Sequence, residues 1–186
     1  MPRPTREQID DDIVETAAAL FARHGFDQTS VQRIADAVGY SKTGLLHRFP
    51  TKEALQVAAV TRCADLVGAI TRDVEDRPPG PARDLAVVTA VTDLALRRPG
   101  YVALMLGAVG AGPDTAVFTG LQEIAEGLFR AFAAPSEGTT ERTLRVVGAL
   151  GALAVTSLAC GEAPAADVRP LIIATGYDAL GHERTT

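Results

Sequence analysis

The chain has 186 residues, of which 47% are hydrophobic and 22% are charged. A chain of this size and composition can bury a substantial core in one or two compact domains. The net charge of −5 excludes a protein that coats nucleic acid indiscriminately through a positive surface. Apolar residues recur at helical spacing and seldom alternate with period two, which argues against a β-sheet protein and predicts an all-α fold.

The first predicted helix begins at a possible capping box formed by Thr5 and Gln8 and ends at Gly25. Its apolar positions are spaced so that they form one buried stripe. The residues of this stripe are Ile9, Ile13, Ala17, Leu20 and Phe21. We expect this helix to brace the two helices that follow it.

The second predicted helix runs from Val31 to Val38, with one buried stripe at the i, i+3, i+4, i+7 spacing. Thr29 and Gln32 are placed to form a capping box at its start. Gly39 stands where the chain leaves the helix, because a residue without Cβ takes the left-handed conformation of a tight C-terminal cap at little cost. The sequence therefore predicts a sharp turn after this helix.

A third helix is predicted to follow the N-cap Ser41, with Tyr40 packed against Leu45 as a hydrophobic staple. Gly44 inside it costs about 1 kcal/mol relative to Ala. Close approach to DNA or tight packing against a neighbouring helix would explain that glycine. Residues 29–49 thus predict a helix-turn-helix, whose second helix reaches base edges in the major groove. One exposed arc of that helix holds Lys42, Thr43, Leu46 and His47.

The fourth predicted helix has Thr51 as its N-cap and Lys52 in its first turn. Free backbone N–H groups and an ammonium at a positive dipole end would form a phosphate clamp. The apolar pattern of this helix continues to Val74, and the Pro-rich segment 77–81 ends it. Such a long helix would act as a lever between two domains.

These motifs resemble the TetR family of bacterial transcriptional regulators along the first third of the chain. The resemblance rests on Ser30-Val31-x-x-Ile34-Ala35-x-x-Val38-Gly39, on Ser41-Lys42 through Leu45 and Phe49, and on Lys52-Glu53-x-Leu55. The DNA contacts that it implies fall on Ser30, Gln32, Lys42, Thr43, Gly44, His47 and Lys52.

The chain departs from the family at two positions of the third helix. Leu46 stands where the family often has a tyrosine that contacts a phosphate, and Arg48 stands where it often has histidine. Arg48 could supply the contact that Leu46 lacks. The candidate DNA-binding residues also include Leu46, from the exposed arc, and Arg33, from the local cluster of cations.

Positive charge is concentrated around the predicted helix-turn-helix. Residues 28–52 contain four cations, Arg33, Lys42, Arg48 and Lys52, against the single carboxylate of Asp36, a net charge of +3 that leaves −8 for the rest of the chain. A small basic patch on an acidic body favours site-specific DNA binding.

The rest of the chain predicts five further helices, which makes about nine in all. Their expected ranges are 82–98, 101–109, 115–132, 141–160 and 168–181. We divide the chain into a DNA-binding domain, 1–66, and a C-terminal ligand-binding and dimerisation domain, 67–186.

The helix 141–160 is apolar on all sides, so it must be covered from two directions. One cover would be its own domain and the other a second copy of the chain. The resemblance implies a homodimer through the last two helices, about 141–160 and 168–181, and two recognition helices then imply a palindromic operator in double-stranded DNA.

The family's C-terminal domain implies a small-molecule effector that releases the protein from DNA. Nothing in the sequence identifies that effector or its pocket. Asp93, within an otherwise apolar helix, could meet a polar or cationic ligand or could simply face solvent.

The start of the chain, from Met1 to Gln8, is polar and has no signal-peptide pattern, so we expect a cytoplasmic protein. The most apolar run, from Val146 to Cys160, is shorter than the ~20 residues that span a bilayer, so we expect no membrane partner. Cys63 and Cys160 have no disulfide or metal-ligand spacing and predict buried, reduced thiols.

An alternative is a helical enzyme or small-molecule-binding protein in which the helix-turn-helix is only structural. The scattered histidines and the lack of a catalytic constellation or phosphate loop argue against it. We therefore predict no enzyme, catalytic residue, cofactor or metal site. An activator, or a regulator without a ligand, would share every motif with a repressor.

Overall fold

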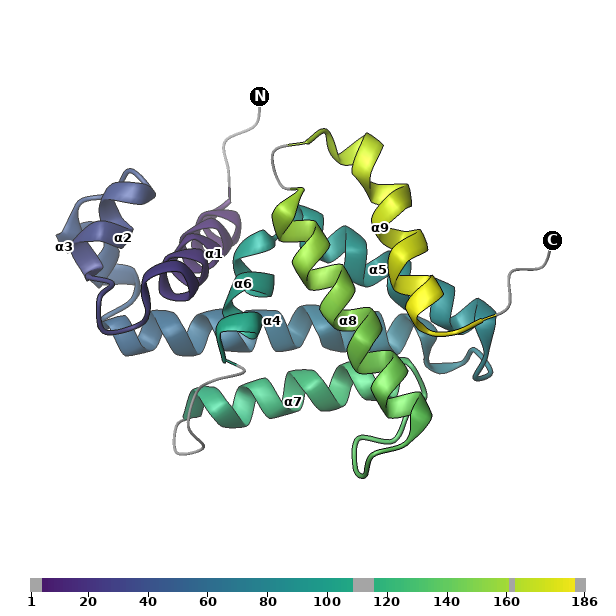
Figure 1. Cartoon of the computed structure of the whole chain (residues 1–186). Coiled ribbons are helices and arrows are strands. Elements are labelled where there is room, and N and C mark those ends of the chain that lie inside the picture. Colours follow the sequence, from purple (N-terminus) through teal and green to yellow (C-terminus); the bar gives the residue numbers. More distant parts are fainter. Residues whose placement is uncertain (1–4, 109–115, 161–162, 183–186) are drawn as a thin grey trace. The chain divides into compact units, whose positions relative to one another are not determined.

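The computed structural model describes residues 5–108, 116–160 and 163–182, which form nine α-helices and no strand (Figure 1). The all-α prediction is confirmed. The expected helix ends at Val109 and Thr115 lie outside the described residues. The helices are α1 (Arg6–His24), α2 (Val31–Ala37), α3 (Lys42–Arg48), α4 (Lys52–Glu75), α5 (Pro81–Arg97), α6 (Pro99–Ala108), α7 (Ala116–Ala131), α8 (Glu141–Ala159) and α9 (Ala165–Ala179).

The chain folds into two compact units that interleave along the sequence. The first consists of Met1–Cys63 with Gly100–Leu121, and the second of Ala64–Pro99 with Gln122–Thr186. The helices α4 and α7 are each divided between the two units. The functional division into 1–66 and 67–186 remains a proposal.

The first unit is organised around α1, which begins with the predicted capping box. The hydroxyl of Thr5 accepts from the Gln8 backbone N–H at 3.2 Å, and the Gln8 side chain accepts from the Thr5 backbone N–H at 2.8 Å. Side chains from α1 to α4 form an apolar interior, so α1 braces the helices after it as expected. These buried residues include Ile13, Ala17, Phe21, Ile34, Leu45 and Leu55.

Gly100 explains how α6 approaches the backbone of α1 within the first unit. A Cβ at Gly100 would lie 2.5 Å from the carbonyl oxygen of Glu15 and 3.2 Å from the amide nitrogen of Ala19. No real side chain fits at that distance, and a backbone contact cannot rotate away. Only glycine therefore permits this approach.

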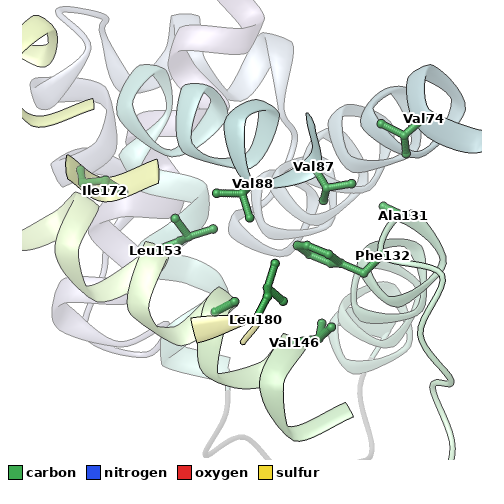
Figure 2. Close-up of a cluster of buried hydrophobic side chains, with 10 residues drawn as sticks. Val74, Val87, Val88, Ala131, Phe132, Val146, Leu153, Ile172 and Leu180 are labelled. Atoms are coloured by element: carbon green, nitrogen blue, oxygen red, sulfur yellow. The ribbon is translucent and has the colours of Figure 1, made fainter. Parts of the chain in front are cut away.

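The core of the second unit is made by α5, α8 and α9 with the ends of α4 and α7 (Figure 2). Gly176 allows α9 to lie close to α8, because a Cβ there would be 2.6 Å from the buried side chain of Leu153. The buried cluster consists of Val74, Val87, Val88, Ala131, Phe132, Val146, Ala149, Leu153, Ile172 and Leu180.

Two buried charged residues at the start of α5 stabilise the surrounding helix ends. Asp84 accepts two hydrogen bonds from Arg142, at 2.7 and 2.8 Å, and lies 2.6 Å from Nε2 of His182. Arg83 donates to backbone carbonyls at the ends of α4 and α7, at distances from 2.7 to 3.3 Å. A cation is favourable there, because helix C-termini carry partial negative charge.

The carboxylate of Asp93 is paired within the protein, so it is neither open to a ligand nor simply exposed to solvent. Its carboxylate forms a two-point ion pair with Arg169 of α9, at 2.5 and 2.9 Å. Hydrogen bonding to this guanidinium holds the pKa of Asp93 below its ordinary value of 3.8. The pair therefore stabilises the fold above that value, and its contribution is lost as the pH falls through the lowered pKa.

By length and composition alone, α4 and α8 are each long and apolar enough to cross a membrane. Both helices also contribute to the protein core. Leu55, Ala59 and Val67 of α4 are buried, as are Val146 and Leu153 of α8. These two helices are thus packed against protein along one side, as core helices are.

Both cysteines are free, as expected, but only Cys63 is fully buried. Its thiol lies 3.8 Å from the sulfur of Met105, and burial raises the pKa of Cys63 to about 12. Cys160, at the end of α8, is partly exposed.

Cys63 should resist a maleimide at pH 8 in the native protein, because the reactive thiolate is almost absent at that pH. A Cys160→Ser variant isolates this thiol, and mass spectrometry before and after urea unfolding measures the labelling. A Cys63→Ser variant provides the control, in which Cys160 reacts. Rapid labelling of Cys63 without urea would contradict its burial.

Candidate nucleic-acid interface

The start of α2 differs from the sequence prediction. Its N-cap is Ser30, whose hydroxyl accepts from the backbone N–H of Arg33 at 3.1 Å. Thr29 is buried instead, with its hydroxyl 2.8 Å from the carbonyl oxygen of Gly25 and 3.2 Å from that of Leu20. The predicted Thr29–Gln32 capping box is therefore wrong, because the carbonyl groups at the end of α1 bind the Thr29 hydroxyl.

The turn between α2 and α3 forms as predicted. Gly39 has a φ of +72°, and the backbone N–H of Tyr40 donates to the carbonyl oxygen of Ala35 at 2.9 Å. This bond satisfies a carbonyl in the last turn of α2. Ser41 then caps α3 by accepting from the Gly44 backbone N–H at 3.0 Å.

The predicted exposed face of α3 is present. Lys42, Thr43 and His47 are exposed, Leu46 is half-buried and Leu45 is fully buried. Close contacts within the turn explain the glycine at position 44. A Cβ there would lie 3.1 Å from the Ser41 hydroxyl and 3.6 Å from the Tyr40 ring. Without a side chain at 44, the cap and the turn pack closely against the first turn of α3.

The exposed residues of α2 include one constrained side chain. The amide of Gln32 donates to the carboxylate of Asp36 at 2.7 Å, one turn further along the helix. Arg33 is exposed beside it. The candidate residues of α2 and α3 lie on helices that contact each other (Figure 1).

The start of α4 is less open than a free phosphate clamp. Thr51 is the expected N-cap and accepts from the Ala54 backbone N–H at 3.0 Å. The ammonium of Lys52, however, donates to the carbonyl oxygen of Phe26 at 2.8 Å and lies 4.1 Å from the centre of its ring. Hydrogen bonds from its own backbone N–H and then from the Thr51 hydroxyl lower the pKa of Glu53, so a carboxylate already lies at this helix end.

The predicted basic patch offers fewer free cations than the four that the sequence places there. Arg48 forms an ion pair with Asp10 of α1, and Lys52 bonds to a backbone carbonyl. Within residues 28–52, all of which are described, Arg33 and Lys42 are the exposed cations without an ion pair.

Partial burial, followed by the charges of Arg33 and Arg23, lowers the pKa of His24 near the end of α1.

Two short helices joined by a sharp turn, with a polar outer face on the second one, have the geometry of the helix-turn-helix class. Comparison with known sequences agrees with this class and specifies it further. Residues 13–59 match the family described as bacterial regulatory proteins, tetR family. Over these residues the chain is similar to the tetR family of bacterial regulatory proteins.

Curated relatives match the same part of the chain. The HTH-type transcriptional regulator RutR of Escherichia coli K12 is 41% identical over 54 residues, which cover 29% of this chain and 26% of RutR. The HTH-type transcriptional repressor KstR2 of Mycobacterium tuberculosis H37Rv is 34% identical over 74 residues, covering 40% of this chain and 37% of KstR2. The matched segments thus span between a quarter and two fifths of these relatives.

Solved structures match nearly the whole fold at low sequence identity. A TetR-family regulator from Bordetella parapertussis has a TM-score of 0.63 at 24% identity, covering 92% of this chain and 95% of that one. KstR2 of Mycobacterium tuberculosis has a TM-score of 0.61 at 19% identity, covering 97% and 95%. The likeness to these structures is therefore one of fold, and it includes the C-terminal helices.

Proposed function

We propose that the chain is a ligand-responsive transcriptional regulator that binds a palindromic operator as a homodimer. The observation that carries this proposal is the exposed polar face of α3. Lys42, Thr43 and His47 lie on this face, and Ser41 caps the helix. The first turn of a recognition helix reaches base edges, so Lys42 and Thr43 would read bases. His47, one turn later, would contact the edge of the groove.

The remaining candidate residues would position the protein on the DNA backbone. Ser30 and Gln32 lie at the start of α2, where backbone N–H groups and side-chain donors favour phosphate. Arg33 adds a free guanidinium beside them. Gly44 and Leu46 would contribute close approach and apolar contact rather than charge.

A second copy of the chain would cover the outer face of α8 and α9. Two glycines of α8, Gly148 and Gly151, have open space where a Cβ would be, so another helix can approach closely there. A symmetric pair of such faces would bury the exposed apolar side chains of α8 and α9. The exposed fractions are 60% for Leu144, 52% for Val147, 58% for Val155, 38% for Leu158 and 68% for Leu171.

We further propose that the protein is a cytoplasmic repressor released from DNA by a small molecule. The curated relative KstR2 is named a repressor, and this supports repression over activation here. The effector and its pocket remain unassigned.

Selection of bound duplexes from a random DNA library, at physiological salt, tests the proposed function. Enrichment of a palindrome is the expected outcome. A chain that enriches no sequence, and whose binding disappears as salt rises, would favour the alternative in which the helix-turn-helix of a helical enzyme or small-molecule-binding protein is only structural.

Replacing Lys42 by alanine should weaken operator binding by about 1–3 kcal/mol and change the preferred base at one position of each half-site. Fluorescence anisotropy with the selected duplex measures the affinity, and a repeated selection measures the preference. Arg72→Ala removes an equally exposed charge far along α4 and serves as the control. Unchanged affinity in Lys42→Ala would show that this face of α3 does not read bases.

Replacing Lys52 by alanine should weaken binding to all sequences equally and reduce the salt slope by about one unit, if the ammonium leaves Phe26 for a phosphate. The slope is measured by titrations from low to high salt. A variant with the original slope and a lower free energy of unfolding would contradict the phosphate contact, and it would assign Lys52 to the internal tie with Phe26.

Replacing Leu171 by aspartate should weaken dimerisation at least about tenfold, because symmetry buries the new charge twice. Sedimentation equilibrium measures the dimer constant. Leu85→Asp makes the same change at a residue of α5 that is 44% exposed, and it should leave the dimer intact. Equal weakening by both variants, or by neither, would place the interface elsewhere.

A further inference from the structure

The recognition helix α3 has little apolar support for its orientation. Of its seven residues, only Leu45 is buried. A helix this short is not stable alone in water and gains its order from contacts with the rest of the fold. Apart from its cap and its contact with α2, the helix therefore has one buried side chain to hold its orientation.

The second anchor of α3 is its last residue, Arg48. The guanidinium of Arg48 is hydrogen-bonded to the carboxylate of Asp10 in α1, and it lies over the Tyr40 ring, 5.7 Å from the centre. Thus one side chain joins α3, α1 and the turn between α2 and α3. The pair and Leu45 hold the helix at two separate places.

Partial burial makes this ion pair stronger than a surface pair. The side chains of Arg48 and Asp10 are 21% and 34% exposed, so water screens their charges less than it does on an open surface. The planar guanidinium also restricts the angle at which the two groups meet. These properties suit a group that fixes orientation.

We propose that Asp10 is a positioning residue for DNA recognition, acting through Arg48 to hold α3 at a fixed angle to α1. This inference rests on the proposed function and deepens it. Asp10 makes no DNA contact in this account. It precedes the segment 13–59 that matches the family.

The neighbouring residue provides a matched control. Asp11 forms an ion pair with Arg62 at 2.5 Å, with exposed fractions of 19% and 34%, and it ties α1 to α4 rather than to α3. Asp10→Asn and Asp11→Asn therefore make the same chemical change, on the same helix, to similar pairs. A general loss of stability would appear in both variants.

The first measurement is amide hydrogen exchange of the DNA-free variants, with their free energies of unfolding measured in parallel. Asp10→Asn should accelerate exchange in α3 by about tenfold, and Asp11→Asn should change it less than about twofold. Equal exchange of α3 in both variants would overturn the proposal. This measurement does not depend on DNA binding.

The second measurement is affinity for the selected duplex at several salt concentrations. Asp10→Asn should bind about three- to tenfold more weakly with an unchanged salt slope, because the number of phosphate contacts stays the same. Arg48→Lys, which keeps the charge but loses the planar fork, should behave like Asp10→Asn. Asp11→Asn should stay within about twofold of the original chain.

Tighter binding by Asp10→Asn, with a steeper salt slope, would overturn the proposal and show that Asp10 withholds Arg48 from a phosphate. Full affinity in Arg48→Lys would likewise overturn it. If the original chain binds no duplex at all, the proposed function fails, and the exchange comparison still decides whether Asp10 orients α3.

Discussion

The seven-residue helix α3 must take its orientation from its neighbours, and in this protein α2 contacts α3 directly, while α1 contacts α2 and binds Arg48 of α3 through Asp10. Ile34 of α2, Leu45 of α3 and the apolar side of α1 are buried, and the polar side of α1 binds Arg48 and Arg62 through successive aspartates. The close contact at Gly100 joins α6 to the same helix. In the first unit, α2, α3, α4 and α6 are thus each tied to α1, although α1 itself carries none of the candidate base contacts.

Among the described residues, several arginines act as internal ties. Four of them pair with aspartates on other helices, joining α3 and α4 to α1 in the first unit and α8 and α9 to α5 in the second. Arg83 adds a cation buried among backbone carbonyls. The charge available to DNA is consequently less than the sequence count of +3 suggests. A protein with few free cations must rely more on base contacts than on general attraction to phosphate.

The sequence predicted what depends on neighbouring residues. The capping box at Thr5, the left-handed Gly39, the caps Ser41 and Thr51 and the outward face of α3 all follow from short-range spacing, and the structure confirms them. It could not predict side-chain pairs between distant residues. Arg48 and Asp10 are 38 residues apart, Lys52 and Phe26 are 26 apart, and Arg169 and Asp93 are 76 apart. The error at Thr29 has the same origin, because carbonyl groups of the preceding helix bind its hydroxyl. The Gln32–Asp36 bond, at i, i+4 spacing, could have been found.

We propose that one small polar surface on α2, α3 and the start of α4 binds DNA. Amide hydrogen exchange of the protein, with and without its selected duplex, tests that claim most directly. The expected result is new protection concentrated in residues 30–52, with little change in the α8 and α9 residues of a dimer that is already formed. Protection concentrated in α5, α8 or α9, with residues 30–52 unchanged, would contradict it.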